Sequence, residues 1–535
     1  MLPSPDSLPL RAQLGQLIVP LLPSHAYASD TGALEAQLAA LRQGEWGGYI
    51  TIFPEPDLTT ALTRLQAEAA LPLLVACDLE RGAGQHLAGL SRFPHLMALG
   101  AADSPDLAYE QGRLTALEAR SAGVHWVLAP VADVNSNPAN PIINVRSFGG
   151  NPERVATLVE AFVKGCQEHG ALATVKHFPG HGDTDVDSHA ALPVIRASRE
   201  QLERVDLPPF RRAIASGVAS VMTGHIAVPA LDPTLTPATL SEPIITGLLR
   251  RDLGFDGLVV TDAFNMAGVA EGFGEEDAAI QAIRAGCDVI LMPPNPLRVL
   301  DALERAVEDG RLSRERVLDA CRHVLAAKVS IGLTSREAAS PVEIIRPHPD
   351  SKRVAEAIAA QAVTMVVGDE TVLPLNPAET TCLLLDDDAD PSVYAAWDEA
   401  LAGYGMSRRV LTPQSGPLDY GQAMAELKKA KTVLVPVFAH VRAWKGRIGL
   451  LPEMAGLLNR LVASGVQLVM VSFSNPYLLR QVPGVAAYFC AYSDHPACQR
   501  AALEVVMGDR PPQGILPVDL GLSDPGPMDH GLVDV

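Results

Sequence analysis

Short apolar runs alternate with longer helical patterns over the first 335 residues of the chain. Helical patterns occupy stretches such as 106–122, 152–169, 199–216 and 276–285. Eight apolar runs predict strands, at 16–20, 48–53, 72–77, 125–129, 173–175, 220–222, 258–260 and 288–291.

This alternation favours a parallel sheet covered by helices on both faces, because its strands are continuously apolar. Eight such units in about 335 residues match a (β/α)8 barrel of the TIM type. A doubly wound sheet also places polar groups at the carboxyl ends of its strands, so that fold stays open as an alternative.

A second, smaller α/β unit follows a break in the pattern. The stretch 336–350 contains prolines at 341, 347 and 349, which disfavour both helix and strand. We therefore predict a linker over these residues. We therefore expect the barrel at 1–335 and a second α/β domain at 351–535, with no nucleotide-binding loop in the second domain. Its predicted strands are 363–367, 381–385, 432–437, 467–472 and 486–490, with a helix at 451–464.

Composition and charge narrow the class of partner. Hydrophobic residues make up 48% and charged residues 19% of the chain, which fits a globular protein with large cores. The net charge of -20 would repel nucleic-acid phosphates, and no apolar stretch has the length and purity of a membrane span. We expect a small-molecule partner, no nucleic acid and no membrane, and leave the oligomeric state open.

The cysteines and the first twenty residues bear on the compartment. The seven cysteines are scattered, odd in number and free of CxxC spacing, as expected for core residues in a reducing compartment. The start of the chain lacks the basic and apolar regions of a secretory signal. These two patterns predict a cytoplasmic protein.

Titratable residues follow several predicted strands. Asp78 comes after the third, Asp133 lies beyond the fourth, and Lys176 and His177 close the fifth. His225 and Asp262 follow the sixth and seventh. Barrel enzymes place their chemistry at these carboxyl ends, so we expect the side chains to meet at one mouth.

The densest chemistry lies in the stretch 176–189, which holds three histidines and three aspartates. Its glycines and proline exclude a regular helix or long strand, and so many titratable groups in a loop indicate an active site. His189 lies two residues after Asp187, a spacing that lets a carboxylate orient an imidazole for proton transfer. We expect His181 to shape the loop.

These residues alone predict a hydrolase that uses a carboxylate and a histidine. Asp262 is a candidate nucleophile or cation stabiliser. Lys176, Arg146 and neighbouring polar groups supply hydrogen bonds for a polyhydroxylated ligand. A barrel metallohydrolase is the alternative, but the histidines lack HxH or HExxH spacing, so we expect no metal.

Several motifs, in the same order along the barrel, closely resemble those of the β-N-acetylglucosaminidases of glycoside hydrolase family 3. The later α/β unit resembles, more loosely, the α/β sandwich domain that follows the catalytic barrel in many members, so the resemblance implies a sandwich over 351–535. The motifs that carry the resemblance are Cys77-Asp78-Leu79-Glu80, Ala129 to Val134, Arg146-Ser147-Phe148-Gly149, Lys176 to Gly182 with Asp187-Ser188-His189, Met222 to His225, and Thr261 to Met266.

The resemblance implies a retaining mechanism without a cofactor. Asp262 would be the nucleophile, and His189, oriented by Asp187, the acid and base. The residues that it places around the terminal sugar are Asp78, Arg146, Lys176 and His177, with Asp133, His225 and His86 as further candidates. His86 stands where the family's N-acetylglucosaminidases usually carry an arginine, and Arg81 is a possible replacement.

The expected activity is release of terminal β-linked N-acetylglucosamine from muropeptides or chito-oligosaccharides, with peptidoglycan recycling as the setting that the resemblance suggests. Two activities of the same family stay open: phosphorolysis of such glycosides and β-glucosidase activity. An alternative of another class is a sugar-binding protein without turnover. The survival of Asp262, Asp187 and His189 in the sequence favours an enzyme.

Overall fold

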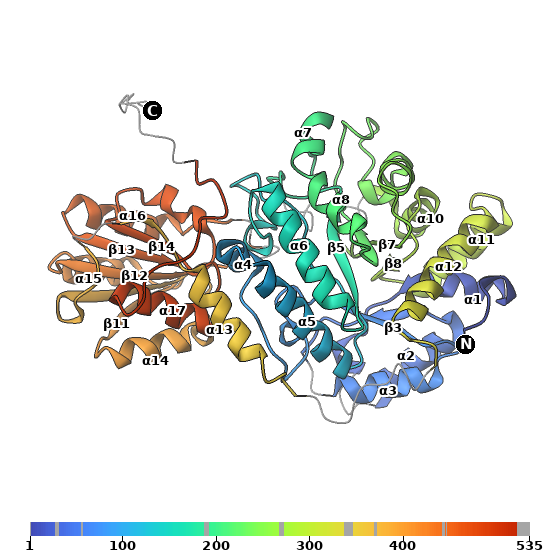
Figure 1. Ribbon diagram of the computed structural model, residues 1–535, viewed down its shortest axis with the longest axis horizontal. Coiled ribbons are helices and arrows are strands. Elements are labelled where there is room, and N and C mark those ends of the chain that lie inside the picture. Colours follow the sequence, from blue (N-terminus) through green and yellow to red (C-terminus); the bar gives the residue numbers. More distant parts are fainter. Residues whose placement is uncertain are drawn as a thin grey trace.

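The computed structural model describes residues 2–26, 31–54, 57–186, 192–266, 272–335, 346–368, 372–440, 445 and 447–521. Two sheets organise the chain, one in each half of the sequence. Figure 1 shows the barrel half on the right and the second sheet with its helices on the left.

The first half is a closed parallel barrel. Strands β2 to β7 form one six-stranded sheet, and β1 pairs with β8 in parallel. Bridges between Leu21 and Ile50 and between Val260 and Val289 join these two sheets, so the eight strands close on themselves. The predicted barrel is confirmed, with strands β1 Ile18–Val19, β2 Gly48–Ile50, β3 Leu74–Cys77, β4 Trp126–Val127, β5 Leu172–Phe178, β6 Ser220–Thr223, β7 Leu258–Thr261 and β8 Ile290–Leu291.

Local sequence sets the helix starts around the barrel. The Ser104 hydroxyl caps the amide of Leu107, and the Asn151 side chain caps that of Arg154, each with a proline in the first helical position. The helix predicted at 199–216 is two helices, because Pro208 and Pro209 lack amide protons and are accommodated in a new first turn. The helices are α1 Leu10–Gly15, α2 Thr31–Gly44, α3 Leu58–Glu68, α4 Leu96–Ala102, α5 Pro105–Ser121, α6 Pro152–Gln167, α7 Arg199–Arg204, α8 Leu207–Ala215, the π-helix η6 Pro243–Asp252, α10 Glu275–Ala285, α11 Pro296–Glu308 and α12 Arg314–Ser330.

The second half is a six-stranded sheet in the order β11-β10-β12-β13-β14-β9, parallel except for β9. The sequence predicts five of these strands and misses β11, an edge strand that begins with two arginines and is only half-buried. The strands are β9 Thr364–Val367, β10 Thr380–Asp386, β11 Arg408–Leu411, β12 Thr432–Phe438, β13 Gln467–Ser472 and β14 Ala487–Cys490.

Helices cover both faces of this sheet. Helices α14 and α13 both pack on α17, while α15 packs on α16. In Figure 1 these two groups lie on opposite sides of the strands. The helices are α13 Ser351–Ala362, α14 Ala395–Gly403, α15 Pro417–Leu427, α16 Pro452–Ala463 and α17 Pro496–Met507.

The junction between the halves is packed and hydrogen-bonded. Helix α13 contacts α4 and α5 of the barrel, and its fully buried Ile358 belongs to the same apolar cluster as the barrel core. Asn135, beyond β4, donates to the Tyr477 hydroxyl at 2.9 Å, after β13. The carboxyl edge of the second sheet therefore faces the mouth of the barrel. The domain boundaries stay a prediction, since most of the segment 336–350 lies outside the described residues.

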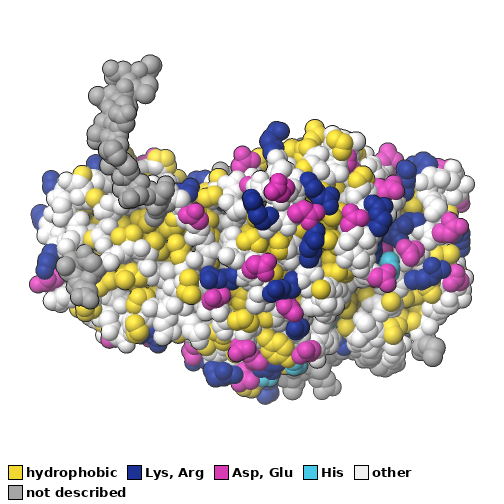
Figure 2. Space-filling view, turned by 45° about the horizontal axis from the view of Figure 1, so that its top comes forward, with side chains coloured by type: hydrophobic (Ala, Val, Ile, Leu, Met, Phe, Trp, Pro, Cys, Tyr) yellow, Lys and Arg dark blue, Asp and Glu magenta, His cyan; other side chains and the backbone are white. Residues whose placement is uncertain are grey.

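The surface and the apolar segments bear on the expected partners. Figure 2 shows acidic and basic side chains interspersed over one face of the barrel half. Among the described residues no helix is long and apolar enough to cross a membrane. All seven cysteines are unpaired and buried.

Candidate active site

A cavity of about 570 Å³ opens at the carboxyl ends of the barrel strands. Six predicted site residues line it: Asp78, His86, Arg146, Lys176, His177 and Asp262. Asp133 and His225 are fully buried behind that lining. Asp187 and His189 lie outside the described residues.

A chain of ion pairs forms one wall of the cavity. The buried Lys176 ammonium, on β5, donates to Asp78 at 2.5 Å and lies 2.8 Å from Glu80. Burial alone would lower the pKa of Lys176, but the carboxylates of Asp78 and Glu80 outweigh it and raise the pKa. Lys176 therefore stays charged and can donate to a ligand oxygen at neutral pH.

Glu80 holds two cations together and was absent from the predicted site. Its two carboxylate oxygens accept from the Arg146 guanidinium at 2.7 and 3.0 Å. Burial alone would raise the pKa of Glu80, but the charges of Arg146 and Lys176 outweigh burial and hold this pKa well below its usual range. An available signal was the spacing of Asp78 and Glu80, because residues two apart in an extended segment share a side.

Asp133 fixes the imidazole of His177. One carboxylate oxygen lies 2.8 Å from Nδ1 of His177, and the other accepts from its backbone amide at 3.0 Å. With Nδ1 facing Asp133, Nε2 is the ring nitrogen left for the cavity. Asp133 has zero exposure, so the structure places it as a support for His177.

Asp133 also anchors the turn that carries His181. The His181 amide donates to it at 2.7 Å, and Nδ1 of His181 bonds the Thr184 hydroxyl at 2.9 Å. His181 shapes the loop as expected, and it lines the cavity as well. Burial lowers its pKa to about 4, so the ring is neutral at pH 7.

Two glycines allow this turn to pack closely. A Cβ on Gly182 would lie 1.7 Å from the Val134 carbonyl oxygen, closer than any side chain tolerates. Gly180 has a φ of +126°, a conformation that side chains rarely adopt. The glycines thus set the approach of the loop to the segment after β4.

Asp262 follows β7 at the cavity wall. Its Oδ1 accepts from the Ala263 amide at 2.8 Å, which leaves Oδ2 for a ligand. Burial raises the pKa of Asp262, but His177, His225 and the Ala263 amide outweigh it and lower the pKa. The carboxylate is therefore ionised at neutral pH, as a nucleophile requires.

His225 lies beneath this carboxylate. Its Nδ1 bonds the Thr239 hydroxyl at 2.8 Å and its Nε2 lies 3.1 Å from the Ala263 carbonyl oxygen. These bonds fix the backbone beside Asp262, and the ring has zero exposure. The structure places His225 where it supports the Asp262 turn.

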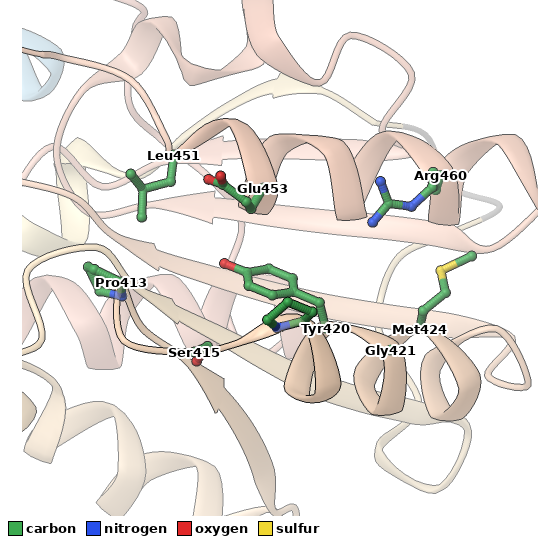
Figure 3. Close-up of a pocket in the computed structure, with 9 residues that line it drawn as sticks. Pro413, Ser415, Tyr420, Gly421, Met424, Leu451, Glu453 and Arg460 are labelled. Carbon is green, nitrogen blue, oxygen red and sulfur yellow. The ribbon is translucent and has the colours of Figure 1, made fainter.

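A larger cavity, about 810 Å³, lies far from these groups in the second half of the chain. Figure 3 shows Tyr420 of α15 facing the side of α16 that carries Glu453 and Arg460. Its lining has one carboxylate, that of Glu453, and one cation, that of Arg460, whereas the barrel mouth gathers several carboxylates, cations and histidines, so the smaller cavity is the candidate active site. Among the described residues no cluster of three or more histidines, cysteines or carboxylates is arranged to hold a metal ion.

Comparison with known proteins bears on this arrangement. The model of the glycosyl hydrolase family 3 N-terminal domain matches residues 51–327. The chain belongs to glycoside hydrolase family 3. As a family 3 member it is a glycoside hydrolase that acts on O-glycosyl bonds.

Relatives extend the match to the second half of the chain. A β-N-acetylglucosaminidase/β-glucosidase of Cellulomonas fimi is 30% identical over 95% of this chain and 93% of its own length. β-Hexosaminidase A of Pseudoalteromonas piscicida is 36% identical, over 62% of this chain and 60% of its own length. The family 3 assignment thus covers both domains.

Solved structures share the two-sheet architecture. A family 3 β-N-acetylglucosaminidase of Paenibacillus sp. str. FPU-7 has a TM-score of 0.85 at 33% identity, covering 96% of this chain and 99% of that one. A β-glucoside phosphorylase has a TM-score of 0.86 at 27% identity, covering 97% and 96%. The same fold is therefore shared by proteins named for two different activities, a glycosidase and a phosphorylase.

Removing the Glu80 charge tests the ion-pair wall. We expect Glu80→Gln to lower kcat/KM about 10- to 100-fold, because the two cations that it positions lose their shared carboxylate. Steady-state kinetics on an aryl glycoside measure the effect. Glu110→Gln, which breaks a partly exposed ion pair with Arg113 on α5, is the matched control, with a change below about twofold. Equal losses in the two variants would contradict the role of Glu80.

Proposed function

We propose that this family 3 enzyme is a retaining exo-β-N-acetylglucosaminidase. One observation carries the proposal. The ionised carboxylate of Asp262 lines the same cavity as a wall of charged hydrogen-bond donors. The named activities of the Cellulomonas fimi and Paenibacillus relatives support N-acetylglucosamine as the terminal sugar.

In the first half of the reaction, Oδ2 of Asp262 attacks the anomeric carbon. The glycosidic bond breaks as a covalent glycosyl-aspartate forms, and His189 donates its proton to the leaving oxygen. Asp187 orients His189 and stabilises its charged form. Lys176 and Arg146 hold sugar oxygens, while His177 presents Nε2 to the same ligand.

In the second half, neutral His189 accepts a proton from water. The resulting oxygen nucleophile attacks the anomeric carbon, the bond to Asp262 breaks, and the sugar leaves with its original configuration. Asp262 regains its negative charge, stabilised by the Ala263 amide and the imidazoles of His177 and His225. The cycle needs neither a metal nor an organic cofactor.

The proposal extends to the natural substrate and to the cellular process that the enzyme serves. We infer that the substrates are muropeptides or short chitin fragments and that the enzyme serves peptidoglycan recycling in the cytoplasm. Seven buried, unpaired cysteines support a reducing compartment.

Phosphorolysis is a second candidate, because the likeness to a β-glucoside phosphorylase spans nearly the whole chain. There, phosphate would replace water as the acceptor in the second half-reaction. A neutral histidine repels an incoming phosphate less than a second carboxylate would. The product would then be a sugar 1-phosphate.

The deciding experiment compares aryl β-N-acetylglucosaminide with aryl β-glucoside, each with and without inorganic phosphate. We expect free N-acetylglucosamine, released at the same rate in both buffers, since water is the acceptor. Mass spectrometry of the released sugar identifies the product. A sugar 1-phosphate would establish phosphorolysis, preference for the glucoside would overturn the sugar assignment, and no turnover would support a binding protein.

Asp262→Asn tests the nucleophile. We expect kcat to fall by about 10⁴ or more and the covalent intermediate to vanish, because an amide is a poor nucleophile. Rapid-quench mass spectrometry of the intact protein detects the glycosyl adduct. The control is Asp252→Asn, at an exposed carboxylate that pairs with Arg251. Near-normal activity of the Asp262 variant would refute this assignment.

His189→Ala tests the acid through the leaving group. An alkyl glycoside needs protonation of its leaving oxygen, so kcat/KM should fall about 100- to 10,000-fold. An activated aryl glycoside needs little protonation and should lose far less in kcat/KM. The ratio of the two losses is the readout, and equal losses would argue against a proton donor at this position.

A further inference from the structure

Arg81 brings a permanent positive charge to the active-site cavity. It lies three residues after Asp78 and lines the same cavity, together with Gln85, His86 and His95. Its backbone is fixed on both sides: the amide donates to the Gln85 side chain at 2.8 Å, and the carbonyl accepts from Phe93 at 2.8 Å. The side chain is thus rooted in the loop that carries Asp78 and Glu80.

The partner that fixes its guanidinium comes from the second domain. Nη2 of Arg81 donates to Asp494, beyond β14, at 2.6 Å. The Arg81 side chain is 13% exposed and that of Asp494 is 9% exposed, so solvent screens this pair weakly.

Asp494 is in turn held by its own domain. His440 lies with Nε2 3.3 Å from Asp494 and Nδ1 2.7 Å from Asp388. Lys445 lies 2.8 Å from both Asp387 and Asp388. Burial opposes the charge on His440, but the two carboxylates outweigh it and raise its pKa to about 9. Asp494 therefore faces a charged imidazolium, that of His440, at pH 7.

The protein leaves part of the Arg81 guanidinium unused. Among the described residues its side chain bonds only to Asp494, although a guanidinium carries five N–H donors. The buried Nε–H has no acceptor there. Hydroxyl and carbonyl oxygens of a bound sugar are the natural acceptors for the donors that face the cavity.

The neighbouring His86 cannot supply the same charge. Burial lowers its pKa, and the carboxylates of Asp78 and Glu80 offset this only in part. The imidazole is therefore neutral at pH 7, where Arg81 is charged. Both Arg81 and His86 line the cavity, and of these two residues Arg81 is the cationic hydrogen-bond donor.

We propose that Arg81 is a further sugar-binding residue and that Asp494 of the second domain is its positioning residue. The inference rests on the proposed glycosidase function and deepens it: the glycone site is incomplete without the second domain. Arg81 contacts oxygens of the terminal sugar, because it shares its loop with Asp78 and Glu80. Asp494 acts only through Arg81, by holding Nη2 at the edge of the cavity.

The test compares Asp494→Asn, Arg81→Gln and the double variant on an aryl glycoside. Each single variant should raise KM about 10- to 100-fold with kcat within about threefold, since the lost contact is made in both ground and transition states. The double variant should match Arg81→Gln, because Asp494 has no role once Arg81 is gone. Asp494→Glu, which keeps the charge, should recover part of the lost affinity.

Arg92→Gln is the matched control. Arg92 also approaches Asp494, at 3.7 Å, but its side chain is 49% exposed and lies outside the cavity lining. Its KM should stay within about twofold of the wild type. An unchanged KM in Arg81→Gln, or additive losses in the double variant, would overturn the inference. If Asp494→Asn fails to fold, Arg81→Gln and its KM decide alone.

Failure of the proposed function is visible separately. If the wild type turns over only an aryl β-glucoside, the assignment of N-acetylglucosamine fails, yet the same KM comparison on the glucoside still tests Arg81. A rise in KM on chito-oligosaccharides without a rise on aryl glycosides would place Arg81 at the aglycone and refute the glycone contact.

Discussion

The active-site cavity depends on one buried carboxylate, that of Glu80. Lys176 lies on β5 and Arg146 in the segment before α6, and each cation would be expensive to bury alone. The Glu80 carboxylate accepts hydrogen bonds from both side chains and keeps the two cations at fixed positions in a partly buried wall of the cavity. Asp78 also accepts a hydrogen bond from Lys176 and balances part of its charge. The wall as a whole stays rich in hydrogen-bond donors. A neutral polar ligand with many oxygens matches such a surface.

Buried residues behind the cavity wall hold several of its side chains in place. Asp133 fixes both His177 and the amide of His181, and His225 braces the turn at Asp262. The protein alone makes these contacts, so the side chains that line the cavity are held in place by their neighbours. Pre-arranged donors lose little conformational entropy on binding, which is how a small cavity reaches useful affinity. The network of His440 and Asp494 extends the same principle across the domain junction.

The sequence carries most of the fold and less of the site. Apolar strands at regular spacing predicted all eight barrel strands, because burial on both faces leaves a continuous signal. The edge strand β11 escaped prediction, since its arginines and partial exposure erase that signal. Strand-end residues such as Lys176 and Asp262 were predictable from topology. Glu80 has only its spacing from Asp78 as a local signal, and its pairing with Arg146 is not encoded there. Asp494 has no such signal, because its role depends on a contact with Arg81, which is distant in the sequence.

The burial of all seven cysteines protects their sulfurs from chemical attack while the chain is folded. Burial raises the pKa of Cys287 and Cys382 to about 12 and that of Cys321 to about 11, so their sulfurs are protonated thiols at neutral pH. Oxidants and alkylating reagents attack thiolates, and a folded molecule offers them almost none. Loss of structure would expose all of these sulfurs at once. The same atoms that fill the two cores thus make irreversible oxidation a consequence of unfolding, and the native enzyme is spared.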